Sequence, residues 1–318
     1  MKDTMPMPGF SDALLNGNLW SLRSVPKSDL HNHCLLGGKR TILEAHAGRK
    51  ITPFKAEEAG ISSLNRWIVK EFRPLFNLPG TFEKGVEAAF VQARTDGVIL
   101  LEMSIDALVG KLVNLPGDRI IGILKETHQR MAPGIAFRPE LGFSRRQPLS
   151  LLLSNAASFL ESGYFKSIDL YDDESAQPIS NFKALYRQAR NMKIKCKAHA
   201  GEFGTADSVR NAVETLELDA VQHGIGAADS PGVMRWLADH KIRLNICPTS
   251  NIRLKRIKSY KTHPIRILFD HGVKVTVNTD DALIFGDGVS EQFRKLYRSG
   301  LFSAGELEII RQNGLTSP

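Results

Sequence analysis

Short apolar stretches rich in β-branched residues recur along the chain, and most of them end in polar residues. Amphipathic stretches long enough for helices lie between them, for example residues 182–191, 206–217, 232–240 and 264–271. Strands that alternate with helices form a parallel sheet, and eight such units predict a closed (β/α)8 TIM barrel, an α/β fold. The eight predicted strands cover residues 28–34, 98–105, 135–143, 165–171, 194–199, 220–224, 242–247 and 274–278.

The interval between the first two predicted strands is much longer than the others. It contains a helical run over residues 61–76, followed by the sequence Leu78-Pro79-Gly80. We predict a helical insertion after the first strand that lies over the barrel mouth, where it forms either a lid that excludes bulk water or an additional packing layer. The chain has no low-complexity segment, linker or obvious internal repeat, so we expect one domain over residues 1–318.

Length and cysteine content agree with a barrel protein of a reducing compartment. A single barrel takes roughly 250 residues plus insertions, and this chain has 318. Its three cysteines, Cys34, Cys196 and Cys247, are too few and too scattered for a disulfide framework. No apolar run approaches the ~20 residues of a membrane span, and the N-terminal sequence lacks the pattern of a secretion signal. We therefore expect a cytoplasmic protein with no membrane partner.

The net charge of +8 adds little to this picture. Basic proteins often bind anionic partners, and nucleic acids or phosphorylated substrates are the usual ones. Here the positive residues are spread along the chain, and no nucleic-acid-binding motif accompanies them. We interpret most of this charge as a solvated surface and expect no nucleic-acid partner. The densest stretch contains Arg253, Lys255, Arg256, Lys258 and Lys261.

Candidate metal ligands fall at the carboxyl ends of predicted strands, which is the face where barrel active sites are built. His31 and His33 end the first strand two residues apart, so their side chains point to the same side. His199 ends the fifth strand, and Asp280 follows the eighth. Three nitrogens and one oxygen suit zinc, although iron and manganese accept similar ligands. We predict one zinc ion per chain, with a coordination position left open for water.

Further polar residues are predicted at the same rim. Glu202 lies just beyond His199, where it can act on a substrate, and His223 ends the sixth strand. Asp281 follows Asp280, and adjacent acids at the end of an apolar strand are costly unless a cation or a bound base neutralises them. This convergence favours a catalytic metal site suited to hydrolysis. Structural roles are expected for the other histidines, His46, His128, His240, His263 and His271.

The same runs of sequence resemble the adenosine deaminase family of the amidohydrolase superfamily, from about residue 27 to about residue 314. The ordered combination of His-Ala-Gly-Glu, His-Gly and Thr-Asp-Asp is highly specific for that family. The matching runs are Asp29-Leu30-His31-Asn32-His33, Leu101-Glu102, Ile168-Asp169-Leu170 with Asp173-Glu174, His199-Ala200-Gly201-Glu202, His223-Gly224, Cys247-Pro248-Thr249-Ser250-Asn251 and Asn278-Thr279-Asp280-Asp281.

The resemblance implies a role for each residue of the predicted site. Glu202 would give a proton to ring N1 of a purine, and its pKa should then be raised by burial. His223 would orient and deprotonate the attacking water and stabilise the developing charge, and Asp281 would pair with ring N7. Gly201 would lie beside the substrate. The implied zinc ligands are His31, His33, His199 and Asp280.

The sequence departs from the family pattern at positions that contact the substrate. Adenosine-specific members carry an acid that meets the ribose shortly after the His-x-His run, and this chain has Cys34-Leu35-Leu36 there, followed by Gly37-Gly38-Lys39-Arg40. Lys39 and Arg40 are candidates for contacting an anionic substituent or, equally, a solvent-facing pair. Asp172 replaces a glycine whose amide reads ring N3, which resembles AMP deaminases. Relatives also commonly continue into a last helix beyond Gly314.

Three functions remain open at this stage. The leading one is zinc-dependent hydrolytic deamination of adenosine or a related adenine derivative to the inosine-type product and ammonia, with a small purine as the partner. The alternative is that the enzyme deaminates an anionic adenine nucleotide, or that the same barrel and metal site hydrolyse a different C–N bond. A metal-binding or ligand-sensing protein without activity is the third, although such a protein would not need Glu202, His223 and Asp281.

Overall fold

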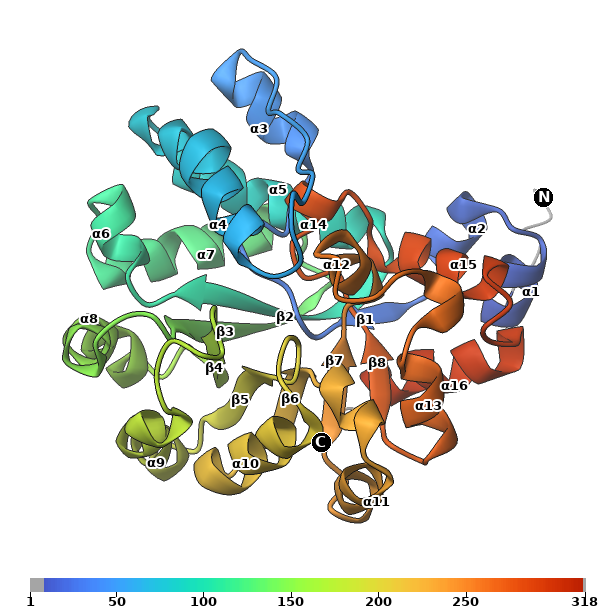
Figure 1. Cartoon of the computed structure of the whole chain (residues 1–318). Helices are drawn as coiled ribbons and strands as arrows, with labels where there is room; N and C mark the ends of the chain where they lie inside the picture. Colours follow the sequence, from blue (N-terminus) through green and yellow to red (C-terminus); the bar gives the residue numbers. More distant parts are fainter. Residues whose placement is uncertain (1–8, 317–318) are drawn as a thin grey trace, which may run out of the picture.

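The computed structural model describes residues 9–316, and its eight strands form one parallel sheet in the order of the chain (Figure 1). Each strand pairs in parallel with the next. This is the (β/α)8 barrel that the sequence pattern predicts. The strands are β1 (Lys27–Asp29), β2 (Val98–Asp106), β3 (Ala136–Ser144), β4 (Ser167–Tyr171), β5 (Lys195–Ala200), β6 (Ala220–His223), β7 (Arg243–Ile246) and β8 (Val275–Val277).

The barrel closes between the segments that follow β1 and β8. Asn32 and Asp280 form an isolated parallel bridge. The backbone N–H of Asp280 donates to the carbonyl of His31 at 2.9 Å, and the N–H of His33 donates to the carbonyl of Asp280 at 3.2 Å. The closing contact therefore joins two segments that carry predicted site residues, which fixes their relative position.

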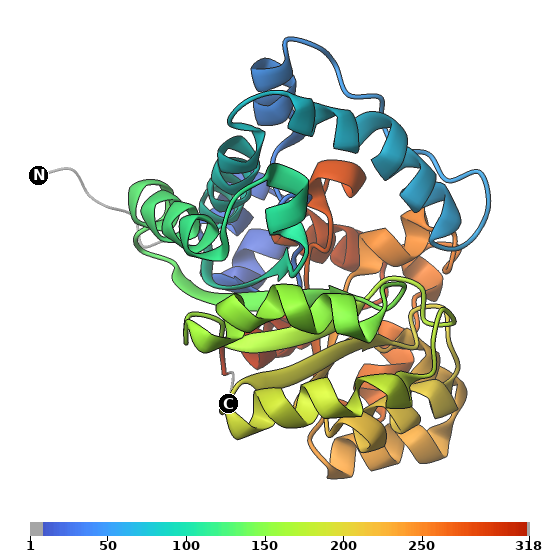
Figure 2. The same cartoon turned by 90° about the vertical axis from the view of Figure 1, so that its left-hand side faces the viewer.

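Helices connect the strands and surround the sheet (Figures 1 and 2). The predicted helices over residues 182–191, 206–217, 232–240 and 264–271 correspond to α9, α10, α11 and α13. The helices are α1 (Phe10–Leu15), α2 (Leu19–Ser24), α3 (Arg40–Ala47), α4 (Ser62–Trp67), η1 (Ile68–Phe72), η2 (Arg73–Asn77), α5 (Thr81–Thr95), α6 (Val109–Val113), α7 (Gly117–Met131), α8 (Leu149–Glu161), η3 (Ile179–Phe182), α9 (Lys183–Asn191), α10 (Ala206–Leu216), η4 (Ile225–Asp229), α11 (Pro231–Asp239), α12 (Pro248–Arg253), η5 (Tyr260–Thr262), α13 (Ile265–Asp270), α14 (Ala282–Phe285), α15 (Val289–Arg298) and α16 (Ala304–Leu315).

The insertion after β1 consists of α3, α4, η1 and η2, and it projects from the top of the molecule in both views (Figures 1 and 2). The single helical run predicted over residues 61–76 is divided into an α-helix, a π-helix and a 3-10 helix, and Pro74 is the second residue of the last of these. Its apolar side chains form a second core with residues of α14, including Leu283 and Phe285. This packing holds the insertion against the loops at the carboxyl ends of the strands.

A layer of buried charge crosses the barrel interior one step below the predicted site. Lys197, two residues before His199 on β5, donates to Glu102 of β2 at 2.8 Å and pairs with Glu140 of β3. All three side chains are buried. Because buried charges are tolerated only when they are paired, this arrangement ties three strands together and forms the floor beneath His199.

The largest difference from the predicted strand boundaries is at the first strand. The first strand was expected over residues 28–34, but β1 ends at Asp29 and the chain continues through isolated bridges. The reason is that His33 bridges Ser104 of β2 while Asn32 bridges Asp280, so the segment divides its contacts between two neighbours. All three cysteines are buried and free. No helix within residues 9–316 is long and apolar enough to cross a membrane.

Candidate active site

The predicted ligands come from three parts of the barrel and meet at its carboxyl-terminal rim. Nε2 of His31 lies 3.6 Å from Oδ1 of Asp280, and Nε2 of His33 lies 3.4 Å from the same oxygen. The ring of His199 lies 4.6 Å from that of His31 and 5.5 Å from that of His33, measured between centroids. The structure therefore brings these four residues together, as their positions at strand ends predicted.

The donor set fits a divalent metal ion. Ligand atoms of His31, His33 and His199 lie within 4.8 Å of one another, and the same holds for His31 and Asp280 with His223. His31 is fully buried, yet neither of its ring nitrogens has a hydrogen-bond partner within residues 9–316. A buried imidazole without partners is costly, and a metal ion satisfies it. Burial also holds the pKa of His31 well below its usual range, so the ring is in the neutral form that binds metal.

A carboxylate behind His199 orients that ring. Nδ1 of His199 lies 3.2 Å from Oδ1 of Asp169 on β4, and Asp169 is fully buried. The second nitrogen of a metal-binding histidine usually donates to such a group, which leaves Nε2 free for the metal. Asp169 lies in the run Ile168-Asp169-Leu170, which resembles the family pattern, but the sequence alone indicated no role for it.

Glu202 and His223 face each other across the same chamber. Oε2 of Glu202 lies 3.7 Å from Nε2 of His223, and Nε2 of His223 lies 3.8 Å from Oδ2 of Asp280. Burial, followed by the charges of Asp280, Glu174 and Asp281, raises the pKa of Glu202 well above its usual value. This direction agrees with the sequence expectation of a protonated acid. Burial together with the charge of Asp280 also raises the pKa of Asp281, to about 7.

The proton on His223 has a defined position. The backbone N–H of Ile265 donates to Nδ1 of His263 at 3.1 Å, so the proton of His263 is on Nε2, which donates to Oδ1 of Asn251 at 3.2 Å. The amide nitrogen of Asn251 then donates to Nδ1 of His223 at 3.3 Å. Burial lowers the pKa of His223 to about 3, against the pull of the Asp280 carboxylate. Neutral His223 therefore carries its proton on Nε2, facing Glu202 and Asp280.

This chain of contacts shows that His263 reaches the site through Asn251. His263 was expected to have a structural role only, since it lies in a loop far from the strand ends in sequence. It is buried, and its two nitrogens bond Asn251 and Ile265. No signal in the sequence identifies it, because its contact with Asn251 of α12 depends on how the chain folds between α12 and α13.

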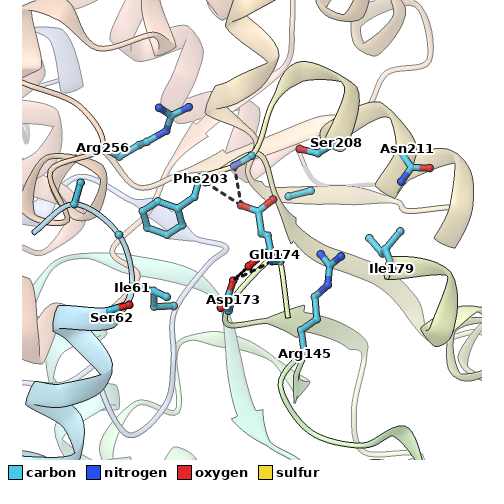
Figure 3. Close-up of a pocket in the computed structure, with 15 residues that line it drawn as sticks. Ile61, Ser62, Arg145, Asp173, Glu174, Ile179, Phe203, Ser208, Asn211 and Arg256 are labelled. Carbon is cyan, nitrogen blue, oxygen red and sulfur yellow. Dashed lines mark hydrogen bonds between the residues drawn. The ribbon is translucent and has the colours of Figure 1, made fainter. Parts of the chain in front are cut away.

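One carboxylate organises the loop that carries Glu202. Glu174 accepts from the backbone N–H groups of Gly201 at 2.7 Å, of Glu202 and Phe203 at 2.9 Å, and of Gly204 at 3.4 Å. Figure 3 shows the Glu174 side chain directed toward the segment that carries Phe203. The loop folds back on itself because Gly201 adopts a positive φ of 67°. Glu174 thus binds four consecutive donors that would otherwise need other partners.

Glu202 is also held from the other side. Nε of Arg256 donates to the backbone carbonyl of Glu202 at 2.9 Å. Arg256 and Arg145 lie on opposite sides of an outer pocket of about 590 Å3, next to the Glu202 loop (Figure 3). Arg256 belongs to the densest basic stretch of the sequence, and most of the positive charge was expected to be solvated, whereas this contact places Arg256 behind the candidate acid.

Three residues at the carboxyl ends of strands adopt the left-handed backbone region although none is glycine. The φ angles are 80° for Asp172 after β4, 62° for His223 in β6 and 61° for Asp280 after β8. Such conformations cost on the order of 1–3 kcal/mol each and cluster at functional sites. The Asp172 carboxylate accepts from Ser144 at 2.8 Å and lies 3.3 Å from Nε of Arg146. Its charge is therefore partly engaged by neighbours.

Lys39 and Arg40 do not share the surroundings of the other candidates. Lys39 precedes α3 as its cap residue, and Arg40 pairs with Glu44 of the same helix at 3.6 Å. Neither residue is among those lining the two cavities that contain His33 and Asp172. The structure thus groups the predicted metal-binding and proton-transfer residues but leaves this basic pair outside.

The candidate catalytic chamber is a cavity of about 90 Å3 roofed by the insertion. Ile61, Leu64, Asn65 and Ile68 form that roof with Leu254, which supports the sequence prediction of helices over the barrel mouth. A roof of this kind excludes bulk water from the polar residues beneath it. The chamber is also lined by His33, Leu36, Tyr171, Asp172, His199, Glu202, His223, Asp280 and Asp281.

Comparison with known proteins places the chain in a family. The sequence profile described as adenosine deaminase matches residues 90–318. A Treponema pallidum protein assigned as an adenosine/adenine deaminase is 35% identical over 290 residues, which cover 91% of this chain and 96% of that protein.

Solved structures agree on the fold. An adenine deaminase from Arthrobacter aurescens superimposes with a TM-score of 0.80 at 23% identity, covering 92% of this chain and 93% of that one. An amidohydrolase from Burkholderia ambifaria, solved with bound zinc, gives a TM-score of 0.78 at 22% identity, covering 99% of this chain and 89% of that one. The chain therefore belongs to the adenosine deaminase family, and it is a hydrolase that acts on C–N bonds.

Proposed function

We propose that this protein is a zinc-dependent deaminase that converts adenosine or a related adenine derivative to the inosine-type product and ammonia. The observation that carries the proposal is the convergence of three imidazoles and Asp280 on one rim, with Glu202 and His223 in the same chamber beneath the insertion. The names of the Treponema and Arthrobacter relatives support a purine substrate. The zinc in the Burkholderia structure supports the identity of the metal.

The residues that would hold the zinc ion are His31, His33, His199 and Asp280. When bound there, zinc supplies a hydroxide nucleophile at neutral pH by lowering the pKa of a water molecule toward ~7. The protein contributes a site in which two ligands flank the closing contact of the barrel and a third is oriented by Asp169. One metal ion per chain accounts for the whole set.

Glu202 supplies the proton that activates the ring. Its raised pKa keeps the carboxyl group protonated at neutral pH, so it donates to ring N1 and makes C6 electrophilic. Glu174 and Arg256 fix the backbone on both sides of this carboxyl group. Positioning of this kind contributes to the rate because the donor is already aligned when the ring binds.

His223 donates a hydrogen bond to the oxygen that develops on C6. Its proton is on Nε2, where it faces the chamber without a hydrogen-bond partner among the described residues. A preorganised donor aimed at developing charge is a strong contribution to catalysis. Neutral His223 therefore serves mainly as a donor in this proposal, which is narrower than the base role that the family resemblance implies.

Asp281 completes the recognition of the ring. Its Oδ1 is buried and has no hydrogen-bond partner within residues 9–316, and it lines the chamber beside Asp280. A purine bound with N1 at Glu202 would present N7 toward Asp281, and because N7 is an acceptor, the Asp281 carboxyl group would donate to it in the protonated form that its raised pKa of about 7 makes available. This contact would hold the amino-bearing edge of the ring toward the metal ligands.

The direct test is incubation of the zinc-loaded protein with adenine and adenosine. Deamination is followed as the ultraviolet change from an adenine to a hypoxanthine chromophore, with ammonia release as a second readout. The matched control is Glu202→Gln, which keeps the size of the side chain and removes its exchangeable carboxyl proton. The absence of both signals with wild-type protein would contradict purine deamination and favour another C–N bond as the target.

A further inference from the structure

A side pocket of about 310 Å3 adjoins the catalytic chamber and has no part in the proposed chemistry. It lies between the insertion and the segment that runs from the end of β2 into α6. The two cavities are direct neighbours because they share part of their walls. The shared lining residues are His33, Leu36, Asn65, Ile68, Tyr171 and Asp172.

Apolar side chains from both flanking segments form much of the wall. The insertion contributes Ile68 and Phe72, and the segment after β2 contributes Leu108, Val109 and Leu112. Leu112 is 44% exposed, so it marks the outer rim of the pocket. These residues create a surface on which an apolar group loses contact with water and is stabilised.

The charged groups of the pocket disfavour an anion. Two carboxylates line it, Asp106 and Asp172. Asp106 accepts from the hydroxyl of Tyr171, and Asp172 accepts from Ser144. Arg73 is the one lysine or arginine among the lining residues, and it is exposed to solvent. A phosphate placed here would therefore meet the carboxylate of Asp106 and that of Asp172, which Arg146 partly neutralises from outside the pocket, while the lining offers one solvent-screened positive charge.

Neutral hydrogen-bond donors lie where the two cavities meet. Nδ2 of Asn65 and Oγ of Ser104 are buried, and neither has a hydrogen-bond partner within residues 9–316. Asn65 lines both cavities and Ser104 lines the side pocket. Buried polar atoms are almost always paired, so these two atoms indicate a ligand with neutral acceptors such as sugar oxygens.

The orientation in the proposed function directs a substituent into this pocket. With N1 at Glu202 and N7 at Asp281, the amino-bearing edge of the purine faces the metal ligands. We infer that the opposite side of the ring, which includes N9, is directed toward Asn65, Ile68 and Asp172, because these residues line both the chamber and the side pocket. A group on N9 must leave the small catalytic chamber through that side, and the side pocket lies beyond it.

We propose that the side pocket selects an uncharged adenine nucleoside whose sugar ends in an apolar group, such as a 5′-alkylthio group. The sugar would lie near Asn65 and Ser104, and the apolar end would lie against Ile68, Val109 and Leu112. The acid that meets ribose in adenosine-specific relatives is replaced here by leucines, which agrees with an apolar preference. This inference rests on the proposed function, since it assumes a purine in the catalytic chamber.

The test compares kcat/KM for adenine, adenosine, AMP and 5′-deoxy-5′-methylthioadenosine with zinc-loaded protein. We expect the thioether to exceed adenosine by about tenfold, the usual effect of one extra apolar group in a pocket. We expect AMP to fall below adenosine by on the order of 100-fold because like charges meet. Turnover of adenosine with an equal or better rate for AMP, or without a thioether preference, would overturn the side-pocket inference alone. No turnover of any of the four would instead contradict the proposed deamination.

Two variants at neighbouring positions test whether the preference for the thioether over adenosine arises in the side pocket. Ile68→Thr places a hydroxyl in the pocket wall and should reduce the thioether-to-adenosine ratio about fivefold to tenfold. Val69→Thr makes the same change on the next residue, which is 56% exposed and does not line the pocket. Its ratio should equal that of the wild type. If Ile68→Thr does not fold, Leu112→Gln at the exposed rim serves the same purpose. An unchanged ratio in a folded pocket variant would contradict the inference.

Discussion

Oε1 of Glu174 accepts the backbone N–H of Glu202 at 2.9 Å, and the same carboxylate binds the N–H groups of Gly201, Phe203 and Gly204. Glu174 therefore determines where the candidate acid stands, without touching the chamber in which it acts. This relationship separates a positioning residue after β4 from the proposed proton donor after β5. It also gives a test of whether the geometry of the loop matters for catalysis.

Replacement of Glu174 by glutamine should reduce kcat more than it changes KM. Glutamine offers one carbonyl oxygen in place of two carboxylate oxygens, so part of the loop loses a charged acceptor worth about 1.5–3 kcal/mol. We expect kcat to fall about 10- to 100-fold. Steady-state kinetics of zinc-loaded protein measures this. The control is Asp173→Asn, because Asp173 binds Ser175 and Arg146 and does not contact the loop. A Glu174→Gln enzyme with kcat within twofold of wild type would contradict the positioning role.

Removal of His263 should disturb His223 through Asn251. Without the donor from His263, the Asn251 amide is free to turn its oxygen toward Nδ1 of His223, which moves the proton away from Nε2. We expect His263→Ala to lose at least about tenfold in kcat, as when a donor to developing charge is removed. The tautomer of His223 is measured by ¹⁵N NMR.

The control for this variant is His271→Ala. His271 is exposed and bonds the carbonyl of Ile267 in its own helix. If His263→Ala is too unstable to purify, Asn251→Asp tests the same link, because Asp cannot donate to Nδ1 when ionised. A folded variant of either residue in which His223 keeps its Nε2 proton and full turnover would disprove the relay.

Loss of the Asp280 carboxylate charge should weaken metal binding. We choose Asp280→Asn because φ at this position is 61°, a conformation that asparagine tolerates better than alanine. Zinc content after dialysis should fall from one ion per chain toward zero, and melting should no longer respond to a chelator. Elemental analysis measures the zinc, and Asp270→Asn on the surface of α13 is the control. Stoichiometric zinc in the Asp280→Asn protein would contradict the ligand assignment.

Glu202→Gln should abolish turnover while it makes the fold more stable at neutral pH. The pKa of Glu202 is raised in the folded state, so between its ordinary value and that raised value the chain takes up a proton on folding. Across that range wild-type stability falls as pH rises, by about 1.4 kcal/mol per pH unit from this group, whereas glutamine has no such dependence. Denaturation of the zinc-loaded wild type and of the zinc-loaded Glu202→Gln variant, between about pH 6 and pH 8, measures how the difference in their unfolding free energies changes with pH. A constant stability difference across that range would show that Glu202 is ionised, and would remove it as the acid.

The convergence of the candidate metal ligands could be predicted from the sequence because each stands at a strand end, and the barrel topology decides which ends meet. His31, His199 and Asp280 lie far apart along the chain, yet the parallel order of eight strands places them on one rim. The fold was predictable for the same reason, since alternation of apolar runs specifies strands and helices. Strand lengths were less predictable. β1 ends at Asp29 because the residues that follow it bridge two different neighbouring segments.

Residues that act through another residue could not be predicted. His263 reaches His223 only because Asn251 stands between them, and nothing in the spacing of these residues indicates that contact. Glu174 lies in the run Asp173-Glu174, which resembles the family pattern, but its contacts with the backbone depend on how the loop after β5 folds back. Conversely, Lys39 and Arg40 follow the histidine run closely in sequence, but α3 places them away from the chamber.

The most direct test of the metal centre is a crystal structure of zinc-loaded protein with anomalous data collected at the zinc edge. We predict one strong peak per chain on the rim, with His31, His33, His199 and Asp280 at the bonding distances of about 2.0–2.2 Å that zinc adopts with nitrogen and oxygen. A peak held by other residues, or none at this rim in protein with stoichiometric zinc, would contradict the account.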